Sequence, residues 1–296
     1  MFVLVLAQQN GAGPLTTVQR RETIHSMEAA LSDGYLYEDV GRRLAQLLEA
    51  RFEQGEFDRF TDPASFATAL EELLRRETND QHFLVWHGPL ADLLKRVPGL
   101  SGPAFGRTEI LPDGIGYIEV RNFLSVDGAD ADRAMAAVKG ASALVFDLRE
   151  TPGGNRQPTL YLSSYLFETR THLVDILARG AAAPDEGWTV DDVQGPRRPT
   201  VPVYVLVSTH TASAGEMFAF GLQRARRAVL VGEKTIGAGH SIRFTPLPNG
   251  FQMLVPISRT VDPRTGEGWE RVGVQPDVAV PAAQALDAAL RLIHAK

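Results

Sequence analysis

Apolar residues recur every three or four positions through the first third of the chain. Three such stripes lie between Thr16 and Trp86, and the spacing places each stripe on one face of a helix. Thr61-Asp62-Pro63 precedes the third stripe, with a capping residue and a proline that favour a helix start. The stripes are Ile24, Met27, Ala30 and Leu31; Val40, Leu44, Leu47 and Leu48; and Phe66, Ala69, Leu70, Leu73 and Leu74. This pattern predicts a small helical bundle over residues 16–90, with the stripes as its core.

Short apolar runs alternate with helical patterns from residue 105 to residue 296. A proline- and glycine-rich connection over residues 97–103 separates this region from the helices. Strands are predicted at 114–120, 143–148, 201–207 and 228–231, and helices at 129–139, 159–167, 214–226 and 282–295. A strand followed by a helix, repeated, predicts an α/β sheet with parallel neighbours.

Two further segments of this region have their own patterns. Residues 243–261 alternate in polarity around Pro248-Asn249-Gly250, which predicts a hairpin. Residues 169–200 are rich in proline, glycine and alanine, and we expect them to form a loop on the substrate side.

The first nine residues are apolar and then abruptly polar, and Gly11-Ala12-Gly13-Pro14 follows. We expect residues 1–15 to be the remnant of a secretion signal, which would make the protein periplasmic or secreted. The alternative is a flexible or strand-like N-terminus of a cytoplasmic protein. No other stretch approaches the roughly 20 apolar residues of a membrane span.

Composition narrows the possible partners. The 296 residues are 44% hydrophobic and 22% charged, and the formal net charge of −6 is spread without long runs of one sign. This distribution argues against nucleic acid or an anionic membrane as a partner. The absence of cysteine excludes thiolate catalysis and cysteine-ligated zinc. The histidines show no metal-ligand spacing, so no metal or other cofactor is expected.

Ser213 lies where the predicted strand 201–207 gives way to the predicted helix 214–226. A serine at such a turn projects from a rigid element, and the unpaired N–H groups of the helix start can stabilise an oxyanion. The spacing Ser213-x-x-Glu216 also matches a capping box, in which the serine only ties down the helix start. Spacing alone favours the cap.

A second turn carries adjacent glycines. Asp147-Leu148-Arg149 ends a predicted buried strand, and Gly153-Gly154 follows within five residues. Paired glycines let the backbone approach a ligand closely and turn N–H groups toward it, which suits an oxyanion hole. The alternative is a tight turn that needs positive φ.

Four segments in this order resemble the tail-specific, or carboxyl-terminal processing, serine protease family, which includes the tricorn protease core and the interphotoreceptor retinoid-binding protein modules. They are residues 147–154, Ser213-Ala214-Gly215-Glu216, residues 231–237, and Val272-Gly273-Val274-Gln275-Pro276-Asp277-Val278. Residues 20–85 are similar to the helical N-terminal domain of the retinoid-binding modules. The resemblance therefore covers nearly the whole chain, and it favours a nucleophile over a cap at Ser213.

The resemblance implies a crotonase-like, Clp-protease-like α/β spiral core preceded by the small helical bundle. It implies Ser213 as nucleophile, with oxyanion donors from Ala214 and from Gly153 or Gly154. The expected partner is a peptide or protein substrate.

This sequence departs from the family in two places. Only about thirty residues separate His82 from the strand at Gly114, too few for the PDZ domain of the processing proteases. Capture of a free substrate C-terminus in a PDZ groove is therefore not expected. The lysine base of those proteases is replaced by Ala238.

Without that lysine, Ser213 needs another base. His82 matches the histidine of the tricorn-like branch, and Glu270 matches its glutamate, so the resemblance implies a triad of Ser213, His82 and Glu270. Thr78 or Asp80 would assist. A histidine packed between bundle and core is the alternative interpretation of His82.

Lys234 and His240 are rival bases. Lys234 would have to lose its proton through burial, and a salt bridge with Glu233 is the simpler interpretation. His240 follows a glycine-rich turn that could place it at a pocket.

Two functions compete. The first is a serine peptidase that cleaves peptides or unfolded chain ends through an acyl-enzyme. The second is a non-catalytic module for apolar ligands, like the retinoid-binding relatives. Retention of Ser213, His82 and the glycine pair favours the peptidase, because a pure binder needs none of them.

Overall fold

The computed structural model describes residues 13–295 except residues 98 and 126. The expected secretion-signal remnant lies mostly outside the described residues. The described chain divides into two compact units. The helical unit comprises residues up to Leu93 together with Ile242–Ile257, and the core unit comprises Leu94–Ser241 and Ser258–Lys296.

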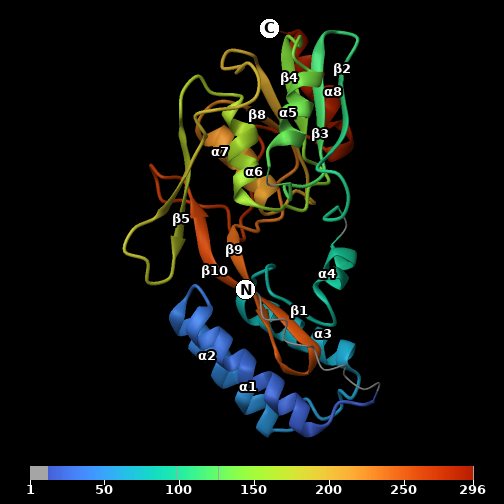
Figure 1. Cartoon of the computed structure of the whole chain (residues 1–296), viewed down its shortest axis with the longest axis vertical. Coiled ribbons are helices and arrows are strands. Elements are labelled where there is room, and N and C mark those ends of the chain that lie inside the picture. The colour runs from blue at the N-terminus through green and yellow to red at the C-terminus, as the bar shows by residue number, and fades with distance from the viewer. Residues whose placement is uncertain (1–12, 98, 126, 296) are drawn as a thin grey trace, which may run out of the picture. The chain divides into compact units, whose positions relative to one another are not determined.

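The helical unit contains the three helices that the apolar stripes predict. They are α1 (Thr17–Gly34), α2 (Glu38–Glu53) and α3 (Pro63–Thr78), and α1 and α2 lie side by side (Figure 1). The Asp62 carboxylate caps α3 by accepting from the Ser65 N–H at 2.8 Å, as the sequence predicts for this start. The stripe residues are largely buried. Hydrophobic contact between the helices therefore holds this unit together.

The sequence assigned the predicted hairpin to the core, but residues Ile242–Ile257 of it belong to the helical unit and only its two ends belong to the core unit. It consists of β9 (His240–Pro246) and β10 (Phe251–Val261), with the short η1 (Pro248–Gly250) between them. Strand β10 pairs antiparallel with β1 (Leu84–His87), which the periodicity did not predict. The side chains of Leu247, Phe251, Met253 and Val255 complete the helical core. They fill the apolar surface that three helices alone would leave open.

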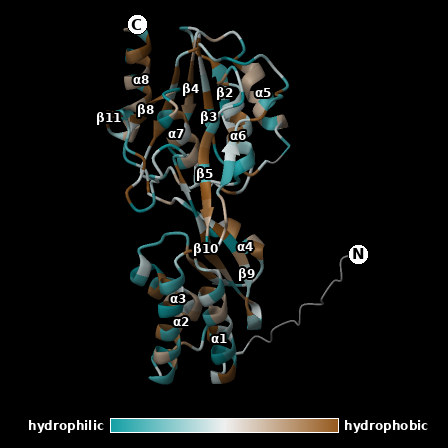
Figure 2. Ribbon diagram, turned by 90° about the vertical axis from the view of Figure 1, so that its left-hand side faces the viewer, coloured by the Kyte–Doolittle hydropathy of each residue, from teal (hydrophilic) through white to brown (hydrophobic). Residues whose placement is uncertain are grey.

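The core unit is built on a six-stranded sheet in the order β11-β8-β7-β4-β3-β2. The bounds are β2 (Phe105–Ile110), β3 (Ile115–Val120), β4 (Ala143–Asp147), β7 (Val203–Val207), β8 (Val229–Gly232) and β11 (Val278–Ala279). All neighbours are parallel except β2 and β3. Every residue of β4 and of β7 is buried, as expected for parallel strands covered on both faces. Figure 2 shows hydrophobic colours on the strands near the label β4.

Helices cover both faces of this sheet. The larger apolar cluster involves α5 (Ala129–Ala137), α6 (Arg156–Ser164) and α7 (Ala214–Arg224). The opposite cluster involves α8 (Ala285–His294), which follows the short η2 (Ala282–Gln284). The repeated strand-helix order thus gives the α/β core that the sequence predicts. A further short helix, α4 (Leu90–Arg96), lies where the two units join along the chain.

Residues 169–200 are not simply the loop that their composition suggested. They contain β5 (His172–Ala178) and β6 (Asp185–Trp188), which form an antiparallel hairpin. Strand β5 also pairs with Ser258–Val261 of β10. Composition predicted a loop because the turn between these strands is rich in alanine and glycine, and because each strand is short and only partly buried.

Candidate active site

Ser213 lies in a turn whose preceding residues are hydrogen-bonded to the loop that follows β4. Its backbone has φ 49° and ψ −114°, a conformation that costs a non-glycine residue about 1–3 kcal/mol. The preceding Ala212 N–H donates to the Thr151 carbonyl at 2.9 Å. The Thr211 hydroxyl donates to the Leu148 carbonyl at 2.8 Å. The loop that follows β4 therefore fixes the strained turn in place.

The glycine pair lies directly against this turn. A Cβ on Gly153 would stand 2.8 Å from the Cβ of Ser213 and 3.3 Å from the backbone nitrogen of Ala214. A Cβ on Gly154 would stand 2.5 Å from the backbone of Phe123. Both glycines have positive φ, at 123° and 141°. Close approach, and not only turn geometry, thus requires glycine here.

The same approach creates a candidate oxyanion hole. Ala214 is the first residue of α7, where backbone N–H groups lack partners within the helix. Gly153 lies next to that nitrogen. A carbonyl oxygen placed beside Ser213 would meet the Ala214 N–H and the positive end of the helix dipole.

Glu216 does more than the capping box predicts. Its carboxylate accepts from the Ser213 N–H at 2.9 Å, which is the expected capping contact. It also accepts from the Gly237 N–H at 2.7 Å, the Ala238 N–H at 2.8 Å and the Thr235 hydroxyl. The side chain is fully buried. Burial raises the pKa of Glu216, and the four hydrogen bonds oppose that rise. The sequence could not reveal these contacts, because three of the four donors lie 19–22 residues further along the chain.

Two hydrogen bonds join the loop after β8 to the segment around Glu270, one between backbone groups and one from the backbone to a side chain. The Arg271 N–H donates to the Gly237 carbonyl at 2.8 Å. The Gly239 N–H donates to Glu270 Oε2 at 2.7 Å. His240 is buried, and its Nδ1 lies 3.7 Å from Glu270 Oε2. Within the core unit, the predicted triad residue Glu270 therefore lies beside the rival base His240.

The surroundings of Lys234, the second rival base, differ from those of Ala238 and of His210, a further histidine near Ser213 in the sequence. Lys234 is exposed. Ala238, at the position of the family's lysine, is buried and directs its N–H to Glu216. His210 is 69% exposed and pairs with Glu150 at 3.1 Å. Neither Lys234 nor His210 has the surroundings of a general base.

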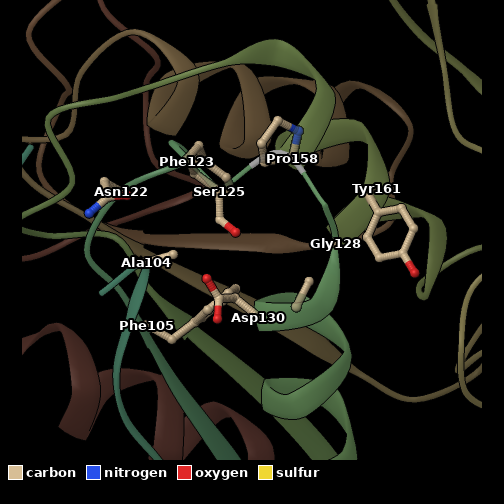
Figure 3. A pocket seen from close by; sticks show the side chains of 10 residues that line it. Ala104, Phe105, Asn122, Phe123, Ser125, Gly128, Asp130, Pro158 and Tyr161 are labelled. Carbon is tan, nitrogen blue, oxygen red and sulfur yellow. The ribbon is translucent and has the colours of Figure 1, made fainter. Parts of the chain in front are cut away.

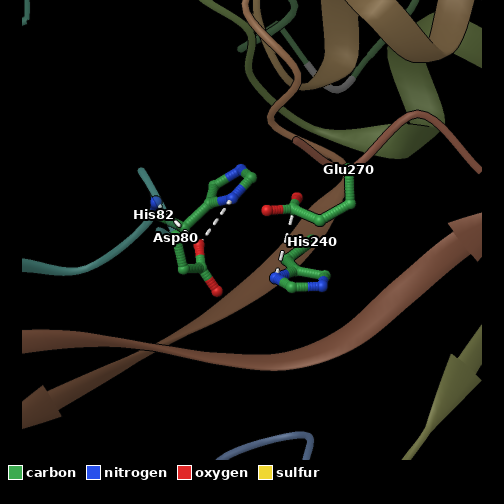
Figure 4. Close-up of side chains that lie close together, drawn as sticks. All are labelled: Asp80, His82, His240 and Glu270. Atoms are coloured by element: carbon green, nitrogen blue, oxygen red, sulfur yellow. Dashed lines mark hydrogen bonds and ion pairs between the residues drawn. The ribbon is translucent and has the colours of Figure 1, made fainter. Parts of the chain in front are cut away.

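His82 belongs to the helical unit, where Asp80 orients it. Asp80 Oδ1 accepts from the His82 N–H at 3.0 Å and lies 3.5 Å from His82 Nδ1. The Asp80 N–H in turn bonds to the Thr78 hydroxyl at 3.2 Å. Figure 4 shows the Asp80–His82 pair and the His240–Glu270 pair, each with its own dashed contact. Asp80 therefore contacts both His82 and Thr78, and a catalytic helper role for Thr78 or Asp80 stays a prediction.

Among the described residues, no helix has both the length and the hydrophobicity to cross a membrane.

Comparison with known sequences gives a family. The sequence profile described as Peptidase family S41 matches residues 114–280. A carboxyl-terminal-processing protease of a Picosynechococcus strain is 30% identical over 169 residues, which are 56% of this chain and 39% of that protein. The chain spans about a third to two fifths of the length of such curated relatives.

Comparison with solved structures gives the fold. The photosystem II D1 C-terminal processing protease matches with a TM-score of 0.60 at 17% identity, over 90% of this chain and 94% of that one. The tricorn protease matches with a TM-score of 0.63 at 11% identity, over 94% of this chain and 36% of that one. The expected Clp-protease-like α/β fold is confirmed by these matches, whereas the particular likeness to retinoid-binding modules stays a prediction.

Proposed function

The chain belongs to peptidase family S41, and from that membership we propose that it is a serine peptidase with Ser213 as its nucleophile. One observation carries the proposal. Ser213 sits in a strained turn, with Gly153 and the start of α7 packed against it. A capping role alone would not require a glycine in contact with the serine side chain. The proposed substrates are peptides or unfolded chain ends.

The proposed reaction uses these groups in turn. Ser213 Oγ attacks the substrate carbonyl carbon and gives its proton to a base, and the carbonyl oxygen becomes an oxyanion. The Ala214 N–H, with that of Gly153 or Gly154, stabilises this charge. The base passes that proton to the amine nitrogen, and departure of the amine leaves an acyl-enzyme. Water, deprotonated by the same base, then hydrolyses the acyl-enzyme and restores the Ser213 hydroxyl.

We propose a histidine as the general base, and the family resemblance favours His82 together with Glu270. The Asp80 contact supports this role, because a base must be held in one orientation. His82→Ala should lower kcat by about 10²–10⁴-fold. His240→Ala is the matched test. A loss of that size in His240→Ala, with His82→Ala fully active, would assign the base to His240 instead.

The first experiment is digestion of a diverse mixture of unstructured peptides, read by mass spectrometry. The wild type is compared with Ser213→Ala, whose folding is checked by circular dichroism. We expect cleavage by the wild type and a loss of about 10³-fold or more in the variant. Equal cleavage by both proteins, or by neither, would contradict a serine peptidase with this nucleophile.

One apolar-walled hollow of the core unit is too small to support the apolar-ligand module. Figure 3 shows a hollow lined in part by Phe123, Pro158 and Tyr161, with the polar side chains of Ser125 and Asp130 directed toward it. Its volume is about 10 Å³, which is room for roughly one water molecule. Small-molecule sites usually occupy several hundred Å³. This hollow does not suit a retinoid-sized ligand.

We also infer that the protein acts outside the cytoplasm. The apolar residues 2–7 support this inference, because an apolar run of this kind is typical of a secretion signal. Fractionation of cells that express the full-length protein tests it, and recovery in the cytoplasmic fraction would contradict it.

A further inference from the structure

Glu216 carries a buried carboxyl group whose hydrogen-bond donors are all neutral. The four donors are three backbone N–H groups and the Thr235 hydroxyl. A buried carboxylate is costly unless its charge is compensated. Asp262, equally buried in the same unit, pairs instead with Arg224 and Arg264. Glu216 therefore has a different role from an ordinary buried ion pair.

The donors come from two separate segments. Ser213 supplies one N–H, and residues 235–238 supply the other three donors. The N–H groups of Ser213 and Ala238 share a single oxygen, Glu216 Oε2. The backbones at these two positions are therefore close neighbours, with the carboxylate between them.

The second segment extends the connection to Glu270. The Thr235 hydroxyl oxygen accepts from the Val274 N–H at 2.7 Å. The Gly239 N–H, one residue beyond Ala238, holds the Glu270 carboxylate. Hydrogen bonds therefore connect the turn at Ser213 to Glu216, Glu216 to the loop that precedes His240, and that loop to Glu270.

We propose that Glu216 is a positioning residue that aligns Ser213 with the 235–240 loop and, through that loop, with Glu270. The inference rests on the proposed function of Ser213. Glu216 does not touch the reacting atoms, because its carboxylate is occupied by the backbone of the turn. It acts by holding a strained serine and a neighbouring loop in one fixed arrangement.

Substitution by glutamine separates shape from acceptor capacity. A carboxylate offers two oxygens that only accept, and four donors face them. An amide of the same shape has one oxygen and one NH2 group, so Glu216→Gln sets a donor against at least one backbone N–H. One of the two segments must then shift.

The test measures the reactivity of Ser213 directly, with a fluorophosphonate probe and a readout by mass spectrometry. Labelling forms a bond between Ser213 Oγ and phosphorus, expels fluoride and passes the hydroxyl proton to the base. The rate therefore reports the alignment of the serine and is independent of peptide binding. Amide hydrogen exchange at Gly237 and Ala238 is measured on the same proteins.

We expect Glu216→Gln to be labelled at least about tenfold more slowly than the wild type, at a temperature where both are folded. Exchange at Gly237 and Ala238 should become faster. Asp262→Asn is the matched control, since it also loses a buried carboxylate of the core unit. It should lose stability and keep the wild-type labelling rate.

Two results would overturn the proposal: labelling of Glu216→Gln within twofold of the wild-type rate, or unchanged exchange at both amides. A slow rate shared by Asp262→Asn would reduce Glu216 to general stabilisation. If the wild type and Ser213→Ala are labelled alike, the proposed function fails, and the exchange data alone decide whether Glu216 joins the two segments.

Discussion

At the scale of single residues, the strained backbone of Ser213 is supported by its neighbours. A left-handed φ at a serine persists only where the surroundings determine it. Here the Thr151 carbonyl, the Glu216 carboxylate and the α-carbon of Gly153 each restrict the turn. Loss of any one of them should affect reactivity before it affects the fold.

Gly153→Ala tests this at the closest contact. The new methyl group would lie 2.8 Å from Ser213 Cβ, so the turn or the glycine loop must shift. We expect kcat for peptide cleavage to fall by about 10–100-fold, with a stability loss of about 1 kcal/mol or more. Gly180→Ala is the control, because its φ is also positive but nothing lies within 4 Å of the new atom. An equal loss of kcat in both variants would refute the steric argument.

Glu28 gives a prediction about pH. Burial, and next the neighbouring Glu49, raise the pKa of Glu28 from 4.5 to about 7, so the folded protein holds a proton that the unfolded chain releases. Its contribution to stability is complete below about pH 4.5 and is lost as the pH rises to about 7. Urea midpoints at pH 5 and pH 8 should therefore differ less in Glu28→Gln than in the wild type. An undiminished difference would show that other groups cause the dependence.

The site residues differ in how far the sequence could identify them. Ser213 and Gly153-Gly154 follow strands within recognisable segments, so their role could be proposed from order and spacing. The hydrogen bonds of Glu216 could not be predicted from the sequence, because three of its four donors belong to a loop about twenty residues further along the chain. Likewise, no pattern places His240 beside Glu270, because a glycine-rich backbone sets that contact.

At the scale of elements, arginine side chains fix the irregular segment between β6 and β7. Arg197 donates to the carbonyls of Val190 and Asp191. Arg227, just beyond α7, donates to the carbonyls of Leu166, Arg198 and Val201. A guanidinium with several donors satisfies carbonyl groups that lie in no regular ladder. The segment is thus ordered without belonging to a sheet.

Arg227→Ala should lower the free energy of unfolding by about 1–3 kcal/mol, because three carbonyl groups lose a donor. Thermal or urea unfolding measures the change. Arg226→Ala, at the exposed neighbouring position, should change it by less than about 0.5 kcal/mol. Similar effects of the two substitutions would contradict the anchoring role.

Strong periodicity made most elements predictable. The three helices of the helical unit, the strands at β3, β4, β7 and β8, and the closing helix α8 follow their apolar patterns within a few residues. Strands β1, β2, β5 and β6 were missed. They are four to seven residues long, and strands this short owe their conformation to pairing with neighbouring strands more than to a local apolar pattern.

At the scale of the whole molecule, the distance along the chain between His82 and the core bears on substrate selection. Among the described residues, 83–104 contain only β1 and α4 as regular elements. These residues are too few to hold a PDZ domain, and we propose that cleavage does not depend on capture of a free C-terminal carboxylate. Amidating the C-terminus of a cleaved peptide should change kcat/KM by less than about threefold. A loss of tenfold or more would show that the carboxylate is recognised.

The helical unit is interrupted in the sequence by the first part of the core, residues 94–241. During synthesis on the ribosome, α1, α2 and α3 emerge long before Phe251, Met253 and Val255, which complete their apolar core. The helices should therefore expose hydrophobic surface until residue 257 has left the exit tunnel. During that interval we expect chaperones to bind the nascent chain, even though its helices are the first elements to be synthesised.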